Sequence, residues 1–516
     1  MKMFLYRKEN LLLKKLFSEK TKAEMTVFFC LISMLLASFF FALLEVTRYH
    51  GLAADAKMSS VLETENIAAE FDADLWQEYG LFFVDSSYGT GTQDLQRLYG
   101  RVLSMAEKNL NPQNARQMSL YKMRMTSCNA LRYEVATDDG GNAFRKQAVE
   151  YEKRNAVSDI AQTIREKLTL SGNTASGEGY REEAVESGKA AIEQAKAERE
   201  QQKAQRTQNG EPQQPEESVP DIEFENPLEL FSLLKANAVL AMVLPQEKTA
   251  SAKSISLAES IERRTLQSGN EEEGSDLSEL DHLIFLGYLT DKYGNFTNKK
   301  ENRCLDYELE YLIAGKESDA ENLEAVVNRI LLQRCATNLL YLHTDAEKCE
   351  IAYTIATVLA GVTANPAIIA AVKEGILAAW AFVESLQDVR TLLSGGRISL
   401  IKTSAQWKTD VLHPATSFSG EYGANSTSTG FSYEDYLLFQ IALESRQTVN
   451  YRAMNLIEQN VSLQSGRVIR MDAMMQQIDM EYEYEANTLF SKLITIGEPK
   501  SSGYSFYEKQ SMSYVS

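Results

Sequence analysis

The sequence predicts an α+β fold that is mostly helical, with a long N-terminal helix, a small antiparallel sheet and a helical second domain. Three observations lead to this prediction. Residues 25–44 are apolar without interruption. Residues 131–136 and 479–484 alternate apolar and polar side chains, as half-buried strands do. Residues 225–465 hold several apolar stretches of helical length between helix-start and helix-stop signals.

The N-terminal apolar run predicts a transmembrane helix. Residues 25–44 contain no charged residue, Gly or Pro, and as a helix they are about 30 Å long, the thickness of the hydrocarbon layer. Residues 1–24 carry seven Lys or Arg and three Glu. This positive-inside bias predicts a single-pass protein with a cytoplasmic N-terminus and a C-terminal body on the other side of the lipid bilayer.

A cleavable signal peptide is the alternative, because Ala54-Asp55-Ala56 offers a small-x-small site. The apolar run is longer than a usual signal-peptide core of roughly 7–15 residues, and Glu45 and Arg48 separate it from that site. The sequence therefore favours a retained anchor.

Beyond the span, apolar residues at three- and four-residue steps predict that the helix continues to Tyr79 as an amphipathic helix and ends at Gly80. Its apolar stripe must pack on a folded body. Glu24 and Glu45 mark the two ends of the span, and Arg48 is an intrahelical partner for Glu45. Either they are simple interface residues, or one of them pairs with a neighbouring subunit in the membrane, as in a homo-oligomer.

The remaining chain is divided by composition. Strands are expected at residues 81–85, 131–136, 397–402, 467–469, 479–484 and 504–507, and helices at 143–154, 226–244, 277–294, 345–359 and 432–459. The predicted parts are a cytoplasmic basic tail (1–24), the span (25–44), an α+β domain (45–170), a charged flexible linker (171–224), a helical domain (225–465) and terminal strands that pack on the α+β domain (466–516).

Two further apolar stretches, residues 351–364 and 366–382, flank Asn365-Pro366. Both are shorter than the roughly 20 residues that a span needs, and Lys373-Glu374 interrupts the second. They predict a buried helical hairpin. Thr344 and Glu347 match a capping box, so a helix should start near Asp345.

The sequence lacks the common catalytic motifs: a nucleophile elbow, a phosphate loop, HExxH and a dinucleotide fingerprint. We therefore predict no catalytic, cofactor-binding or metal-binding residue. His343, between Cys335 and Cys349, fits no zinc spacing. A net charge of -19 argues against nucleic acid as a partner. An extracytoplasmic hydrolase is the least supported function.

Several blocks of the sequence carry a resemblance: residues 26–52, 74–85, 133–153, 305–323, 379–403 and 433–443. Together they resemble an uncharacterised family of Gram-positive bacterial membrane proteins related to the TadE/TadG-like pseudopilins of the Tad (Flp) pilus. The resemblance implies a pilin-like N-terminal helix, location in the bacterial cytoplasmic membrane and no enzymatic activity. Pilin precursors carry a Gly before their cleavage point, and Lys22-Ala23-Glu24-Met25 has none.

The resemblance implies an extracytoplasmic structural or accessory subunit of a Tad-like pilus or secretion apparatus, with Tad-type platform or pilin-like proteins as partners. The alternative is a membrane-tethered envelope adhesin or ligand-binding module, in which residues 226–460 bind an external ligand. The two functions differ in which part of the chain meets its partner.

Overall fold

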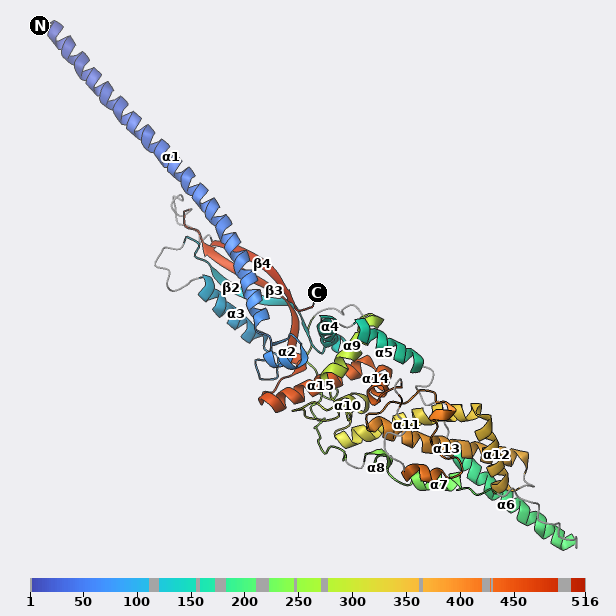
Figure 1. Ribbon diagram of the computed structural model, residues 1–516. Coiled ribbons are helices and arrows are strands. Elements are labelled where there is room, and N and C mark those ends of the chain that lie inside the picture. Colours follow the sequence, from blue (N-terminus) through green and yellow to red (C-terminus); the bar gives the residue numbers. More distant parts are fainter. Residues whose placement is uncertain are drawn as a thin grey trace.

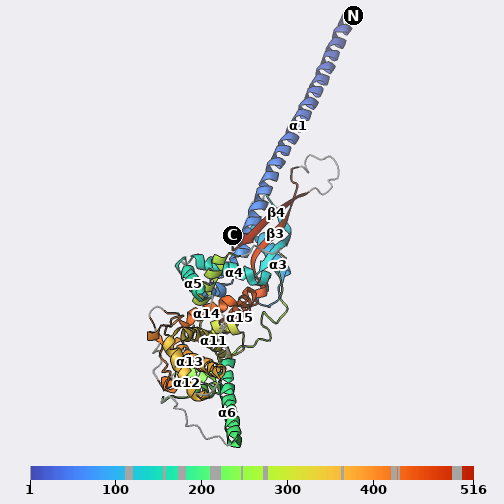
Figure 2. The same cartoon turned by 90° about the vertical axis from the view of Figure 1, so that its right-hand side faces the viewer.

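The computed structural model describes residues 2–110, 120–154, 158–171, 182–209, 222–245, 248–270, 277–361, 365–419, 427, 430–490 and 503–515, with the backbone alone for 2–24, 158–161 and 170–171. The molecule is a long rod (Figure 1). Helix α1 forms one end, a small sheet lies beside its second half, and the helices follow towards the other end. Figure 2 shows the same order from the side. The predicted fold class, mostly helical with a small antiparallel sheet and a long N-terminal helix, is confirmed.

Helix α1 (Lys2–Ala69) ends ten residues earlier than the predicted Tyr79. Phe71 instead bridges to Val84 in an extended conformation. Asp72 then caps a separate helix α2 (Ala73–Tyr79), where its carboxylate accepts the N–H groups of Asp74 and Leu75 at 3.0 and 3.1 Å. An Asp side chain that binds the backbone in this way stops one helix and starts the next. Gly80 ends α2 with φ +69°, as predicted.

The antiparallel sheet is built around β3 (Met474–Asn487). Strand β2 (Arg124–Val135) pairs along one edge of β3, and β1 (Val84–Asp85) and β4 (Gly503–Ser513) share the other edge. The terminal strands therefore pack on the N-terminal α+β part, as predicted. Residues 467–469 are not a strand, and residues 397–402 form only the isolated bridge Ile398–Phe431.

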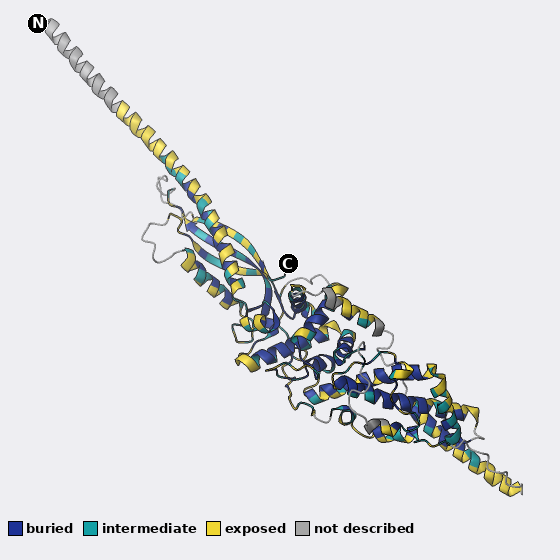
Figure 3. Cartoon of the chain, viewed as in Figure 1, coloured by how far each residue is buried: buried dark blue, intermediate teal, exposed yellow. Residues whose placement is uncertain are grey.

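The alternation along β3 sorts its side chains between the two faces of the sheet. Tyr482 and Tyr484 are fully buried beneath α1 and α3 (Leu95–Leu110). Glu481 and Glu483 lie on the opposite face, where Glu481 pairs with Lys509 at 3.3 Å. Figure 3 shows β3 as mostly buried, whereas α1 is mostly exposed over residues 25–44.

The helices of the body follow in chain order. They are α4 (Asp138–Arg154), α5 (Ser158–Ser171), α6 (Glu183–Asn209), α7 (Pro227–Lys235), α8 (Val239–Val243), α9 (Glu279–Lys292), α10 (Glu308–Ala314), α11 (Asp319–Thr344), α12 (Ala346–Ala360), α13 (Pro366–Leu393), α14 (Tyr433–Leu443) and α15 (Arg446–Ser465). The predicted helices 226–244 and 432–459 are each two helices, because Ala238 and Ser445 begin new ones. Asp345, and not Thr344, caps α12.

Helix α6 differs from the expected linker. Its first half packs against α13 through small side chains, with Ala191 and Ala195 buried. A Cβ atom on Gly188 would lie 3.3 Å from the Cα of Gly375, so the two helices approach more closely than larger residues allow. Its last residues are exposed and extend beyond the body (Figure 3). Residues 172–181 and 210–221, also in the expected linker, lie outside the described residues.

The buried side chains form two cores whose boundary differs from the expected domain boundary. The smaller core joins α1, α3 and the sheet. The larger core contains the helical body together with α2 and α4, through Tyr79 and Phe144 among others. Helices α12 and α13 form the predicted hairpin. By length and composition α13 could cross a membrane, but 67% of its most apolar stretch is buried in the body.

A buried carboxylate in α10 makes a pH-dependent contribution to stability. Glu310 is 0% exposed, and one of its oxygens accepts the Phe296 N–H and the Tyr433 hydroxyl, both at 2.9 Å. Its other oxygen has no hydrogen-bond partner. Burial, opposed by these hydrogen bonds, raises the pKa of Glu310 from 4.5 to about 7. A raised pKa in the folded state stabilises the protein at low pH, and that stabilisation is lost as the pH rises through about 7.

We expect Glu310→Gln to be about 3 kcal/mol more stable than the parent at pH 8 and within about 1 kcal/mol of it at pH 5. The amide keeps the accepting oxygen and removes the charge. Urea unfolding of the full chain in detergent at both pH values measures the difference. Glu308→Gln is the matched control: both Glu308 oxygens accept hydrogen bonds, from Gly294 N and Asn460 Nδ2, so this change should destabilise. If the free energy of unfolding depended on pH in the same way in the parent and in Glu310→Gln, the prediction would be wrong.

Candidate functional site

Residues 25–44 of α1 present an apolar surface that the described part of the chain leaves mostly uncovered. In the most apolar stretch of this segment, 0% of the residues are buried. Phe28, Leu35 and Phe39 are 58%, 68% and 61% exposed. A helix that is apolar on all sides and longer than 18 residues cannot remain in water. α1 is therefore long and apolar enough to span a membrane.

The pair Glu45–Arg48 marks the point where α1 meets the body. Arg48 Nη1 lies 3.1 Å from Glu45 Oε1, and each residue is 6% exposed. The Glu45 carboxylate also accepts the backbone N–H groups of Leu489 and Phe490 at 3.3 and 2.6 Å. Arg48 Nε donates to the carbonyl of Leu120 at 2.5 Å. The pair thus ties the helix to the end of β3 and to the segment before β2.

Electrostatics favour the ionised pair. Burial raises the pKa of Glu45, but the N–H groups of Phe490 and Leu489, the Tyr504 hydroxyl and Arg48 together bring it below its usual value. The carboxylate stays charged at neutral pH and can hold both backbone donors. Glu45 and Arg48 therefore both have partners within their own chain, because backbone groups of the body bind each of the two side chains.

Aromatic side chains surround the same junction. Phe490 stacks on Phe41 at 6.1 Å between ring centroids, and Tyr49 lies 5.1 Å from Tyr504 and 5.4 Å from Phe506. Tyr rings, which carry a polar group, are typical of the water–lipid interface, and two of these five rings are Tyr. From α1 the group takes Phe41 and Tyr49, so it lies around the C-terminal end of the apolar stretch.

The structure brings together two of the three residues singled out in the sequence. Glu45 and Arg48 are in contact, whereas the side chain of Glu24 lies outside the described residues. Sequence reasoning missed Leu489, Phe490 and Tyr504, which are more than 440 residues away along the chain. The sequence contains one signal for this part of the site. Tyr504 and Phe506 are two residues apart in a predicted strand, which places both rings on one face of that strand.

We expect Glu45→Ala to loosen the junction by about 1–3 kcal/mol, because it leaves the Arg48 guanidinium without its carboxylate and two N–H groups without an acceptor. Hydrogen exchange of the full chain should show faster exchange at Leu489 and Phe490. Glu65→Ala, an exposed Glu on the same helix, is the matched control and should leave both amides unchanged. Unchanged protection in Glu45→Ala would contradict this role.

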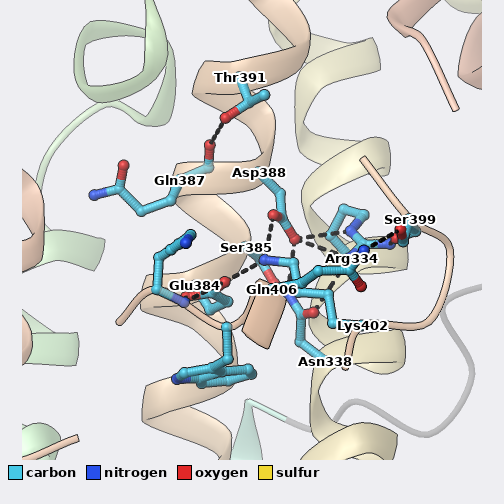
Figure 4. A network of polar contacts seen from close by, with 12 residues as sticks. Arg334, Asn338, Glu384, Ser385, Gln387, Asp388, Thr391, Ser399, Lys402 and Gln406 are labelled. Carbon is cyan, nitrogen blue, oxygen red and sulfur yellow. Dashed lines mark hydrogen bonds and ion pairs between the residues drawn. The ribbon is translucent and has the colours of Figure 1, made fainter. Parts of the chain in front are cut away.

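A second group of charged residues lies inside the helical body (Figure 4). Arg334 on α11 and Lys402 both contact Asp388 on α13, at 2.9 and 2.5 Å, and Lys402 also contacts Glu384. Burial raises the pKa of Asp388, but Lys402 and Arg334 together hold it below its usual value. Arg334 Nη1 also donates to the carbonyls of Ser399 and Leu400 at 3.1 and 2.8 Å. The two cations and two anions neutralise one another, so this network holds segment 399–409 on the helices.

The other candidate groups have structural roles. Among the described residues no three His, Cys, Asp or Glu side chains are grouped as metal ligands. His343 faces Glu374 at 3.5 Å on the surface. Asp72 and Asp74 both pair with Arg467, at 2.6 and 2.7 Å. The five cysteines are free thiols.

Comparison with known proteins gives one match. No curated protein matches the chain, and no solved structure matches it. A model of a family of unknown function, DUF5702, matches residues 217–486, which include α7 to α15 and most of β3. Because the match spans just over half of the chain, this protein belongs to the DUF5702 family.

Proposed function

We propose that this protein is a membrane-anchored, extracytoplasmic structural subunit of a Tad-like pilus or secretion apparatus in the bacterial cytoplasmic membrane. The observation that carries the proposal is the continuity of α1. One unbroken helix is bare over residues 25–44 and packed on the sheet from Glu45 onward, so the span and the body move as one rigid unit. Subunits that assemble through their N-terminal helices need this coupling, and the resemblance to pseudopilins is consistent with it.

The anchor is tested by charging the span. Leu35→Arg with Phe39→Arg places two cations where each costs about 2.5–3.5 kcal/mol, so the full chain should lose stable membrane insertion. Leu463→Arg with Val468→Arg, at residues 59% and 56% exposed on the body, should stay in the membrane fraction. Carbonate extraction of membranes measures both. Protease added to spheroplasts should digest the body of the parent, and its protection would reverse the proposed topology.

The partner is tested by photo-crosslinking in the intact chain. A crosslinker at Phe29 or Leu36 in the span should capture platform or pilin-like proteins if the protein is an assembly subunit. A crosslinker at Leu340 or Tyr353, exposed on α11 and α12, should capture an external ligand if it is a tethered binding module. The rod shape favours a tethered binding module as the alternative function. It places the helices of the body, with α6 at the tip, at the end farthest from the N-terminus (Figure 1). Capture from the body alone would refute the assembly role.

A further inference from the structure

A buried arginine in α4 has no carboxylate partner. Arg145 is 2% exposed, and its Nε atom has no hydrogen-bond partner. Its guanidinium lies over the Phe285 ring at 4.5 Å, and Nη2 contacts Nδ1 of His282. Among the described residues no Asp or Glu lies within ion-pair distance of Arg145. A buried cation without a counter-ion costs several kcal/mol, so its position requires an explanation.

Deprotonation does not remove this charge. Burial and the nearby Arg446 lower the pKa of Arg145, and the more distant Glu279 and Asp281 oppose them, so that the pKa is about 10 and the side chain is positive at neutral pH. Burial, Arg145 and Arg446 lower the pKa of His282 to about 4. His282 is therefore neutral and accepts a hydrogen bond from the arginine at Nδ1. The guanidinium has a neutral partner on one side and a cation nearby.

Arg145 lines a cavity of about 290 Å³ together with Asp139, Asn142, Arg446, Gln447 and Asn450. Two arginines and three side-chain amides thus face one carboxylate, Asp139, which already accepts a hydrogen bond from Asn142 at 3.0 Å. Arg446 is half-exposed and pairs with Glu279 at 3.3 Å at the rim. The lining itself therefore carries two cations and one anion, although the chain carries a net charge of -19.

Helix geometry adds to the positive potential. Arg446 and Gln447 are the first two residues of the 20-residue helix α15, and Leu277, which also lines the cavity, directly precedes the N-cap of α9. The N-terminal turns of helices carry partial positive charge and free N–H groups that bind oxyanions. The buried Arg145 and the two helix starts therefore face the same space.

We propose that this cavity binds an oxyanion, a carboxylate or a phosphate, which Arg145 and Arg446 hold between α4, α9 and α15. Arginine recognises two oxygens of such a group at once. The oxyanion would join the helix that follows β2 to two helices of the body.

The test uses the full chain in detergent and inorganic phosphate as the probe, at constant ionic strength. Phosphate should bind to the parent chain by calorimetry and raise its melting temperature.

Arg446→Gln should weaken phosphate binding about tenfold or more, the effect of losing one charge-assisted hydrogen bond. Arg329→Gln is the matched control, because Arg329 is equally exposed and also pairs with a glutamate, Glu444. It should change the affinity less than about twofold. Absence of phosphate binding to the parent, or equal binding after Arg446→Gln, would overturn the proposal.

Discussion

Replacing Asp388 by asparagine should destabilise the helical body by about 3–5 kcal/mol. The amide has nearly the same shape but no charge, so Arg334 loses its ion pair and Lys402 keeps, among the described residues, only Glu384 as an anionic partner. All four side chains are at most 5% exposed, and water cannot replace the missing carboxylate. A buried ion pair is costly to break even when its net contribution to folding is small. Urea unfolding of the full chain, followed by circular dichroism, measures the change.

The control is a surface ion pair of the same kind. Glu444→Gln removes the partner of Arg329, whose side chain is 47% exposed. It should cost less than about 1 kcal/mol, because water solvates both groups. A double variant, Arg334→Met with Asp388→Leu, should lose less stability than the sum of its single changes, since each single change leaves an unpaired charge. Additive losses would show that the network is not coupled.

The region that matches the family model, residues 217–486, should not fold when it is expressed alone. It contains most of β3 but none of the strands that pair with it, β1, β2 and β4. It also lacks α6, which packs on α13, and α2 and α4, which contribute to the larger core. An isolated strand with two free edges and buried tyrosines promotes aggregation.

Residues 45–516 are the matched control for this fragment. They retain both cores and lack only the tail and the apolar residues 25–44, so they should be monodisperse in size-exclusion chromatography and unfold cooperatively. The fragment 217–486 should elute as aggregate or show no cooperative transition. A monodisperse, cooperatively unfolding fragment would show that the family region is an independent domain and that the sheet is an addition to it.

Local patterns predicted the local features well. The apolar run at 25–44, the helix end at Gly80 and the break between two helices at Asn365-Pro366 all lie where the sequence placed them. Each depends on side chains within one or two turns of the position concerned. The early end of α1 was missed because Asp72 fits an amphipathic helix by spacing and stops it only through its own hydrogen bonds.

The sequence by itself determined where the apolar anchor lies, that most of the chain is helical, and which short segments alternate as strands. The tertiary structure alone decided that β3 pairs with a strand some 350 residues earlier, that α6 packs through glycine and alanine, and that Arg145 lines a cavity with no carboxylate of the described residues at ion-pair distance. The physical reason is that hydrophobic spacing acts over a few residues. The partner of a strand or of a buried charge depends instead on which distant segments the folded chain brings within a few ångströms.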